Sequence, residues 1–194
     1  MLSTLPQGNY RFIALDVETG CGDAASICQI GIACVGYDEQ IETFATYVDP
    51  RMAFSGFNIQ LHGIGPETVR GAPVFEEAMS AMLPLLERHH LVQHSSFDAR
   101  AISKACEAFG FPVPLLSWTD SVRVARKAWP EFKGNGGHGL GHLKVALDLD
   151  FEHHDAGEDA RAAAQVVMQA EERLQQDFDD IREALLPKAK RRVV

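Results

Sequence analysis

The chain has 194 residues, of which 46% are hydrophobic, and its formal net charge at pH 7 is −9. This length suits one globular domain with its own core, and no apolar run reaches the roughly 18 residues that a membrane span requires. The negative charge argues against broad binding of duplex nucleic acid through Lys and Arg clusters, but it leaves room for an enzyme that grips only a chain end.

The start of the chain lacks the basic segment and apolar stretch of a signal peptide. The cysteines form no Cys-x-x-Cys pair, so we expect reduced thiols at Cys21, Cys28, Cys34 and Cys106. These features predict a soluble, cytoplasmic protein with no membrane association. We expect one domain over residues 1–194, with a core over about 10–175 and a helical, basic tail over 176–194.

The first part of the chain predicts three strands. Residues 10–18 form an apolar run, and the segments 27–35 and 41–48 are rich in residues that favour strands. Glycine-containing stretches separate these segments. Short links between successive strands predict an antiparallel meander.

The rest of the chain predicts helices that alternate with short strands. Apolar spacing and helix-ending residues predict helices over 75–88, 99–109, 122–129, 139–147 and 156–186, the last long enough to contain a break. Short strands are expected at 91–93 and 115–118, and a mobile glycine-rich loop at 133–139. Early strands followed by alternating elements predict a mixed sheet surrounded by helices.

Two carboxylates interrupt the apolar first strand. Asp16 and Glu18 are two positions apart, so their side chains point to the same face. Two charges in apolar surroundings are costly unless something compensates them. A solvated strand end is the other interpretation, and the Asp-x-Glu pattern alone is a weak metal signal.

A third carboxylate, Asp98, follows the strand 91–93 and opens the next helix. A carboxylate in this place is ordinarily a helix cap, worth about 1 kcal/mol. Its companions in the sequence, rather than its own position, favour a functional role.

The segment 153–160 contains several competing residues. Asp155 and Glu158 have the spacing of a capping box, which predicts Asp155 as the N-cap. Asp159 then lies one turn inside the helix, where a buried carboxylate needs a partner such as a metal ion. His154 lies in the loop before the helix and is a candidate base, with His153 as the alternative.

Four carboxylates brought together repel one another unless cations lie between them. Hard divalent ions with oxygen ligands meet this need. A histidine outside the ligand set can then act as a base in hydrolysis.

These motifs, in this order, resemble the DEDDh family of 3′–5′ exonucleases, which includes the proofreading epsilon subunit of bacterial DNA polymerase III, ribonuclease T and oligoribonuclease. The resemblance runs from about Phe12 to Val167. It extends to the short motifs Ser-Ile-Cys-Gln-Ile-Gly-Ile at 26–32, Leu-His-Gly-Ile at 61–64 and Thr-Asp-Ser-Val-Arg-Val-Ala-Arg at 119–126. It implies an α/β, ribonuclease-H-like fold, a five-stranded mixed sheet flanked by helices.

The resemblance also implies a catalytic site. Two Mg²⁺ or Mn²⁺ ions would be bound by Asp16, Glu18, Asp98 and Asp159, and His154 would be the general base. The residues expected near the terminal nucleotide are Thr19, His62 and Phe97. We hypothesise that the enzyme releases nucleoside 5′-monophosphates from 3′ ends of DNA or RNA, preferentially single-stranded, alone, as a homodimer or with a polymerase or repair partner.

Two departures from the family pattern affect the expected grip on the substrate. The second motif usually has Asn after its His, and here Ser95 follows His94. The first motif usually has a second Thr before its Gly, and here Glu18-Thr19-Gly20 is shortened. Neither change removes a predicted metal ligand.

Other functions were weighed against this one. A catalytically silent nucleic-acid-binding module of the same fold would be expected to lack a ligand, and an RNA-directed exoribonuclease would share the whole site. A zinc hydrolase is suggested by the spacing of His90 and His94, and of His138 and His142, but the motif His-Glu-x-x-His is absent.

A basic cluster on the predicted helix 122–129 has two interpretations. Arg123, Arg126 and Lys127 are candidates for contacts to a phosphate backbone. The alternative is an ordinary solvated helix face.

Overall fold

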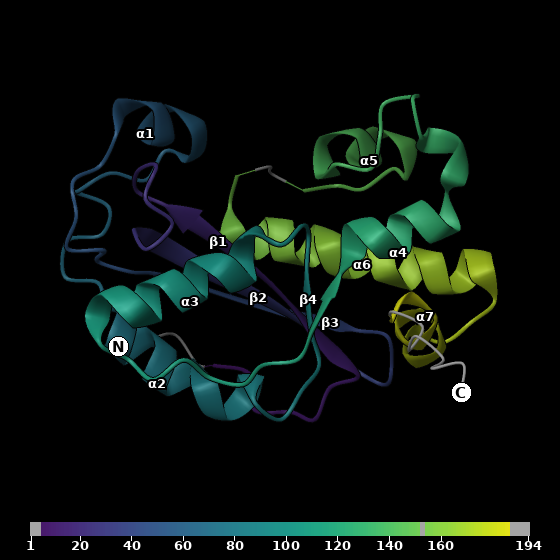
Figure 1. Cartoon of the computed structure of the whole chain (residues 1–194), viewed down its shortest axis with the longest axis horizontal. Helices are drawn as coiled ribbons and strands as arrows, with labels where there is room; N and C mark the ends of the chain where they lie inside the picture. The colour runs from purple at the N-terminus through teal and green to yellow at the C-terminus, as the bar shows by residue number, and fades with distance from the viewer. Residues whose placement is uncertain (1–4, 152–153, 187–194) are drawn as a thin grey trace, which may run out of the picture.

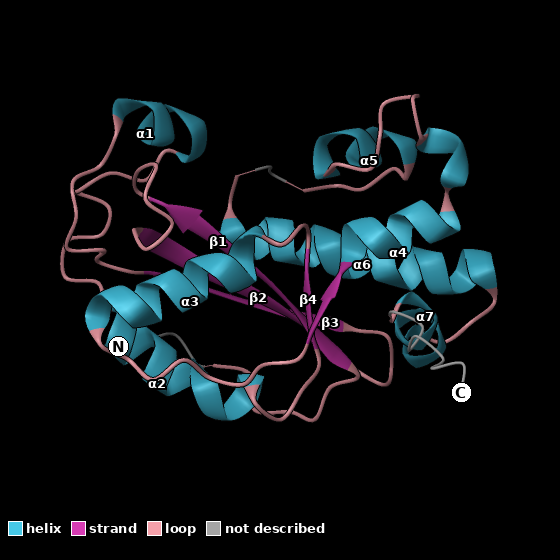
Figure 2. Cartoon of the chain, viewed as in Figure 1, coloured by secondary structure: helices cyan, strands magenta, loops and turns pink. Residues whose placement is uncertain are grey.

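The computed structural model describes residues 5–151 and 154–186. A five-stranded sheet in the order β3-β2-β1-β4-β5 lies at its centre, with helices on both faces (Figure 1, Figure 2). The strands are β1 (Phe12–Thr19), β2 (Ile27–Val35), β3 (Ile41–Tyr47), β4 (Leu91–Gln93) and β5 (Trp118–Asp120). The α-helices are α1 (Gly56–His62), α2 (Phe75–Leu86), α3 (Phe97–Phe109), α4 (Ser121–Ala128), α5 (Leu140–Ala146), α6 (Ala156–Leu174) and α7 (Phe178–Leu185), with a 3₁₀ turn at Pro130–Phe132.

The sheet is mixed, as the sequence predicts. β1, β2 and β3 form the expected antiparallel meander, whereas β4 runs parallel to β1 and β5 runs parallel to β4. In the pairing of β1 with β2, Asp16 lies opposite Gly31 and Glu18 lies opposite Gln29. Two predicted carboxylates therefore face two residues of β2 that are small or amide-bearing.

Alternation along β1 divides the core into two layers. Phe12 and Ala14 pack in the cluster that includes α4, α6 and α7, whereas Ile13 and Leu15 pack in the cluster that includes α2 and α3. Asp16 continues the face of Phe12 and Ala14 because side chains two apart share a face. The strand therefore delivers its carboxylates to the α6 side of the sheet, while its other face stays apolar.

The start of α6 lies directly on β2. A Cβ added to Gly31 would lie 2.1 Å from the carbonyl oxygen of Ala156, so only glycine fits this approach. Beside it, the Gln29 side chain donates to Asp155 Oδ2 at 2.9 Å and accepts from the Ala156 N–H at 3.1 Å. These contacts place the first turn of α6 opposite the carboxylates of β1.

Two elements differ from the sequence prediction, and the long helical stretch at 156–186 is broken, as its predicted length allowed. α1 was not predicted, because it is only seven residues long and none of its side chains is buried, so no extended helical period shows in the sequence. The strand expected at 115–118 begins at Trp118, and Leu115 is 99% exposed after Pro114, which has no N–H to give to a ladder. The helix expected over 156–186 ends where Gln175 adopts a left-handed conformation with φ 52°, and α7 follows.

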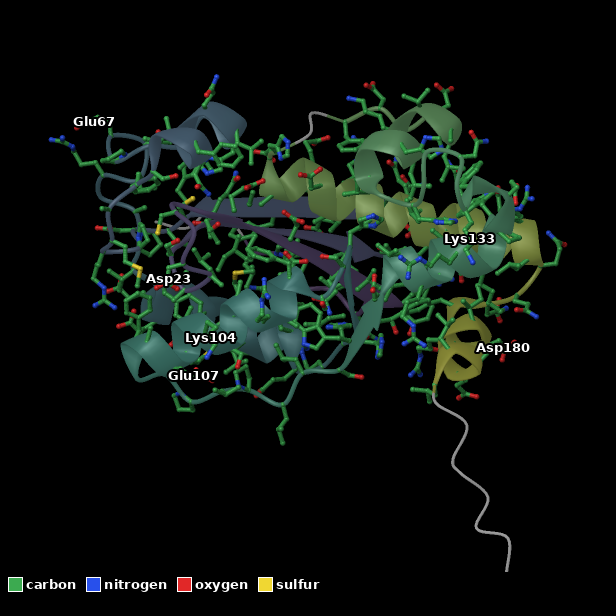
Figure 3. The ribbon with its side chains drawn as sticks, turned by 45° about the horizontal axis from the view of Figure 1, so that its top comes forward. Asp23, Glu67, Lys104, Glu107, Lys133 and Asp180 are labelled. Atoms are coloured by element: carbon green, nitrogen blue, oxygen red, sulfur yellow. The ribbon has the colours of Figure 1, made fainter. Side chains whose placement is uncertain are left out.

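Outside the carboxylate cluster, charged side chains such as Lys104 and Glu107 lie on the surface of the fold. Figure 3 shows Lys104 and Glu107 together on the outer face of α3, where they form an ion pair of 2.7 Å. The four cysteines are free thiols, and three of them are buried. Within residues 5–151 and 154–186, no helix combines the length and apolar character that a bilayer span requires.

Candidate active site

A pocket of about 310 Å³ opens where β1, α3 and α6 meet. It gathers the five residues predicted to be catalytic, together with two of the three predicted to bind substrate. Its described lining is Asp16, Val17, Glu18, Thr19, Asn58, Leu61, His94, Ser95, Phe97, Asp98, Leu140, His154 and Asp159. Segments far apart in the sequence thus meet in one place, and the lining contains no Lys or Arg among the residues that the structure describes.

The two carboxyl groups of β1 keep their protons up to a higher pH than ordinary surface carboxyl groups do. Burial, followed by repulsion from Asp98, Asp159 and Glu18, raises the pKa of Asp16 well above its usual value. Burial, then Asp159 and Asp98, raises the pKa of Glu18 to about 7. The alternative of a freely solvated strand end does not describe these side chains.

Asp98 is not the cap of α3, contrary to the ordinary interpretation of its place in the sequence. The N-cap is Ser96, and Asp98 lies inside the first turn with only 3% of its surface exposed. Its Oδ1 accepts a hydrogen bond from the Val17 N–H at 3.2 Å, which ties α3 to β1 between the two carboxylates of that strand. Burial is the largest cause that raises the pKa of Asp98 to about 7, and the Val17 hydrogen bond opposes it.

The start of α6 supplies the remaining carboxylate and the histidine. Asp155 is the N-cap, as predicted, and its Oδ1 accepts from the N–H groups of Gly157 at 3.0 Å and Glu158 at 3.1 Å. Asp159 is buried one turn further on, and its Oδ2 accepts from the backbone N–H of His154 at 2.9 Å. His153, the alternative base, lies outside the described residues.

Glu18, His154 and Asp159 approach one another closely. Each offers one potential ligand atom, and these atoms all lie within 4.8 Å of one another. His154 is therefore within reach of a metal ion as well as of a water molecule beside it. Carboxylate oxygens suit Mg²⁺ and Mn²⁺, and a divalent cation would offset the repulsion that raises the carboxylate pKa values.

The three predicted substrate-binding residues have different environments. Thr19 and Phe97 lie on the pocket wall, whereas His62 does not. The His62 Nε2–H donates to the Thr19 carbonyl at 3.0 Å, and its Nδ1 accepts from the Ile64 N–H at 3.0 Å. The Asn58 side chain donates to the same Thr19 carbonyl at 2.8 Å, so both residues fasten α1 to the end of β1.

Six wall residues were not assigned a catalytic, metal-binding or substrate-binding role from the sequence: Val17, Asn58, Leu61, His94, Ser95 and Leu140. His94 contacts Ser121 Oγ through Nδ1 at 2.7 Å and the His138 carbonyl through Nε2 at 3.0 Å. Because His94 belongs to the second motif, the sequence already contained a signal that it lies near the site. Asn58 was missed because α1 itself was not predicted, whereas Leu61 belonged to the motif at 61–64 but was given no role of its own.

The histidine pairs that suggested zinc do not form a metal site among the described residues. The group able to hold an ion in that part of the chain is Glu18, His154 and Asp159. His138 Nε2 instead donates to the Trp129 carbonyl at 2.8 Å, and His90 Nε2 lies 2.8 Å from Thr119 Oγ1.

The basic residues of α4 are partly occupied by structural contacts. Arg123 donates to the Leu185 carbonyl, and Lys127 donates to Gln176 Oε1 at 2.6 Å. Both contacts fasten α7 and the turn before it against α4. These hydrogen bonds give Arg123 and Lys127 a structural role.

The sequence matches a known protein family and parts of longer relatives. Residues 13–167 match the model of the family described as exonuclease. The chain is 28% identical over 170 residues to the PolC-type DNA polymerase III of Caldanaerobacter subterraneus subsp. tengcongensis, and 28% identical over 171 residues to the 3′-5′ exonuclease DinG of Bacillus subtilis. Each alignment covers 86% of this chain, but only 12% and 18% of those relatives, which are much longer.

Solved structures share the fold. Exonuclease X in complex with 5′-overhanging duplex DNA gives a TM-score of 0.71 at 20% identity, covering 89% of this chain and 98% of that one. The nuclease domain of 3′hExo, a DEDDh family member bound to rAMP, gives 0.68 at 18% identity, covering 84% and 93%. The ribonuclease-H-like architecture expected from the motifs is confirmed. Because the family model spans most of the sequence, the chain belongs to the exonuclease family, within its DEDD-type 3′–5′ branch.

Proposed function

We propose that the protein removes nucleoside 5′-monophosphates from single-stranded 3′ ends by metal-dependent hydrolysis. The observation that carries the proposal is the cluster of carboxylates from β1, α3 and α6, which lies beside His154 in one pocket. Two of these carboxylates have a pKa raised to about 7 by burial and mutual repulsion. Such a cluster is costly to a fold unless it serves a cation.

Asp16, Glu18, Asp98 and Asp159 would hold two Mg²⁺ or Mn²⁺ ions. When bound, the ions would lower the pKa of a bound water molecule, so that it could supply a hydroxide nucleophile at neutral pH. They would also stabilise negative charge on the leaving oxygen. They would also supply the positive charge that the described lining lacks. The Asp98 side chain accepts from the Val17 N–H and the Asp159 side chain from the His154 N–H, so two of the proposed ligands would be positioned before any ion binds.

His154 is proposed as the general base. Its imidazole lies next to Glu18 and Asp159, at the mouth of the pocket formed by the start of α6. Histidine titrates near neutral pH, which suits the removal of a proton from the attacking water. The leaving 3′ oxygen belongs to the penultimate nucleotide, so one nucleotide is released in each step.

The pocket supports a single strand as substrate. A volume of about 310 Å³ is at the small end of ligand sites and suits one nucleotide better than a base pair. Phe97 and Leu61 offer apolar surface for a base. The name of the PolC-type DNA polymerase relative and the DNA bound to exonuclease X support DNA, whereas the rAMP in the 3′hExo domain supports RNA as the alternative.

A catalytically silent binding module remains the contrasting proposal. It is disfavoured because all five site residues are present and five segments of the described chain bring them and their neighbours into one pocket. Association with a polymerase, as in the PolC-type relatives, would be compatible with an active exonuclease and with a silent binding module.

One digestion panel tests the proposal. The full chain is incubated with 5′-labelled and 3′-labelled single-stranded DNA, duplex DNA and short RNA, each with Mg²⁺, Mn²⁺ or EDTA. We expect a ladder from the 5′-labelled strand and early release of labelled mononucleotide from the 3′-labelled one. Asp16→Asn should abolish cleavage, whereas Asp180→Asn on the distant α7 should not. Digestion from the 5′ end, or activity that survives EDTA, would refute the proposal.

A further inference from the structure

One face of α1 is apolar, exposed and continuous with the pocket. Phe57 is 73% exposed and Leu61 is 40% exposed, and no side chain of the helix is buried. The two residues are four positions apart, so they lie one above the other on the helix surface. Leu61 lines the pocket and Phe57 does not, so Phe57 extends the apolar face beyond the pocket rim.

Hydrogen bonds hold α1 in place, although none of its side chains is buried. Ser55 caps the helix by accepting from the Asn58 N–H at 3.1 Å, and Gly63 ends it with φ 74°. Asn58 and His62 both bond to the carbonyl of Thr19, the residue after Glu18. Figure 1 shows α1 beyond the arrowhead of β1, on the side of the molecule where α6 begins. The position of Phe57 is therefore fixed relative to the carboxylates.

The small size of the apolar face of α1 favours a nucleobase over a protein partner. Two side chains on a seven-residue helix are far too small for a stable protein interface, which buries more than about 1,000 Å². A nucleobase matches an aromatic ring in size and stacks on it regardless of sequence. An upstream base inside a duplex is paired and already stacked between its neighbours, so it must leave the duplex before it can lie against Phe57.

We propose that Phe57 stacks on a base upstream of the nucleotide held in the pocket and thereby selects single-stranded substrates. The proposal rests on the proposed function, since the strand would run from the pocket along α1. Phe57 would act in binding rather than in the hydrolytic step. Its removal should weaken the grip on longer strands without altering the reaction of a substrate that contains a single base.

The test compares substrates of different length. Phe57→Ala should raise KM for a 5′-labelled single-stranded 20-mer by about 5- to 100-fold, the range expected for one lost base stack, with kcat little changed. KM for the p-nitrophenyl ester of thymidine 5′-monophosphate, which contains one base, should stay at the wild-type value. Phe57→Trp should restore the grip on the 20-mer. Tyr37→Ala removes a similarly exposed aromatic ring, 72% exposed in the β2–β3 turn, and should change neither substrate.

Binding measured apart from hydrolysis separates the two proposals. Fluorescence anisotropy of the labelled 20-mer, with Ca²⁺ in place of Mg²⁺, should show the same loss of affinity in Phe57→Ala. An unchanged KM and Kd in Phe57→Ala would overturn the role of Phe57, even in an active enzyme. Inactivity of the wild type on every strand would instead overturn the proposed function. A change in molar mass by light scattering without a change in KM or Kd would assign Phe57 to a contact between copies and would also overturn the inference.

Discussion

Gly31 of β2 and Ala156 of α6 are in backbone contact so close that no Cβ fits between them. Their approach sets the height of α6 above the sheet at the point where Asp16 pairs with Gly31. It therefore sets the distance between the carboxylates of β1 and those of α6.

Gly31→Ala should push the start of α6 away from the sheet. Its added methyl group would lie 2.1 Å from the Ala156 carbonyl oxygen, so we expect a loss of about 1–3 kcal/mol of stability and a melting temperature lower by about 2–12 °C. Activity should fall as well, because His154 and Asp159 move with the helix. Gly22→Ala, where an added Cβ meets nothing within 4 Å, is the matched control in thermal unfolding and nuclease assays. Equal stability of the two variants would contradict the proposed packing role.

Binding of Mg²⁺ or Mn²⁺ should stabilise the fold, and more so at higher pH. In the metal-free protein, the pKa of both Glu18 and Asp98 is raised to about 7 from the ordinary values of 4.5 and 3.8. The folded state then holds protons that the unfolded chain has released, so this contribution to stability is present below about pH 4 and is lost as pH rises through 7. The melting temperature gained on replacing EDTA with Mn²⁺ should be larger at pH 8 than at pH 5.5. Glu18→Gln should reduce that difference, and an equal gain at both pH values in the wild type would argue against a cation at these carboxylates.

His154→Ala should lower kcat by roughly 10²–10⁴-fold, as expected when a general base is lost. Because the carboxylates remain, thermal stabilisation by Mn²⁺ should persist. His142→Gln, on α5 outside the pocket lining, is a matched change that should leave kcat near the wild-type value. If His154→Ala abolished the stabilisation by Mn²⁺ together with activity, His154 would be a ligand rather than the base. Full activity of His154→Ala would exclude both roles.

Ser95→Asn should stabilise the protein. Ser95 has φ 98°, a backbone conformation that Asn adopts more readily than Ser. This explains in part why the family pattern has Asn at this place. We expect a melting temperature higher by about 2–4 °C, which corresponds to about 1 kcal/mol. Ser95→Ala, which loses the 3.3 Å bond from the Phe97 N–H to Ser95 Oγ, should be less stable than the wild type. A ranking of Asn at or below Ala would rule out this explanation.

His90 should make the docking of α7 sensitive to acid. Burial, with a smaller contribution from Arg182, lowers the pKa of His90 from 6.5 to about 4. The unfolded chain therefore binds the proton first, so this contribution to stability is present above about pH 6.5 and is lost as pH falls towards 4. Unfolding of the Mn²⁺-bound protein should show a stability loss over this range that is smaller in His90→Gln. The ring of His90 packs edge-on against that of Phe178 in α7, with the ring centroids 5.7 Å apart. The docking of α7 should therefore weaken first in acid. Identical pH profiles for the two proteins would contradict the role given to His90.

The residues of the site were predictable where local rules decided their direction. Two-residue alternation places Asp16 and Glu18 on one face, and the cap at Asp155 places Asp159 one turn into α6. The arrangement of Gly31 and Gln29 under α6 was not predictable, because it depends on which strand the helix crosses. His62 shows the same limit: its motif was recognised, but its bond to the Thr19 carbonyl depends on a helix that has no buried face.

The wide separation of the ligands along the chain has a consequence for folding. Asp16 and Glu18 lie in the first strand, Asp98 in the middle of the chain and Asp159 in the sixth helix, so contacts of high sequence separation must form before the cluster exists. A newly made or partly unfolded chain would hold isolated acidic residues with little affinity for an ion. The capacity to cut nucleic acid should thus appear in the same cooperative step as the complete fold, which guards against cleavage by incomplete molecules.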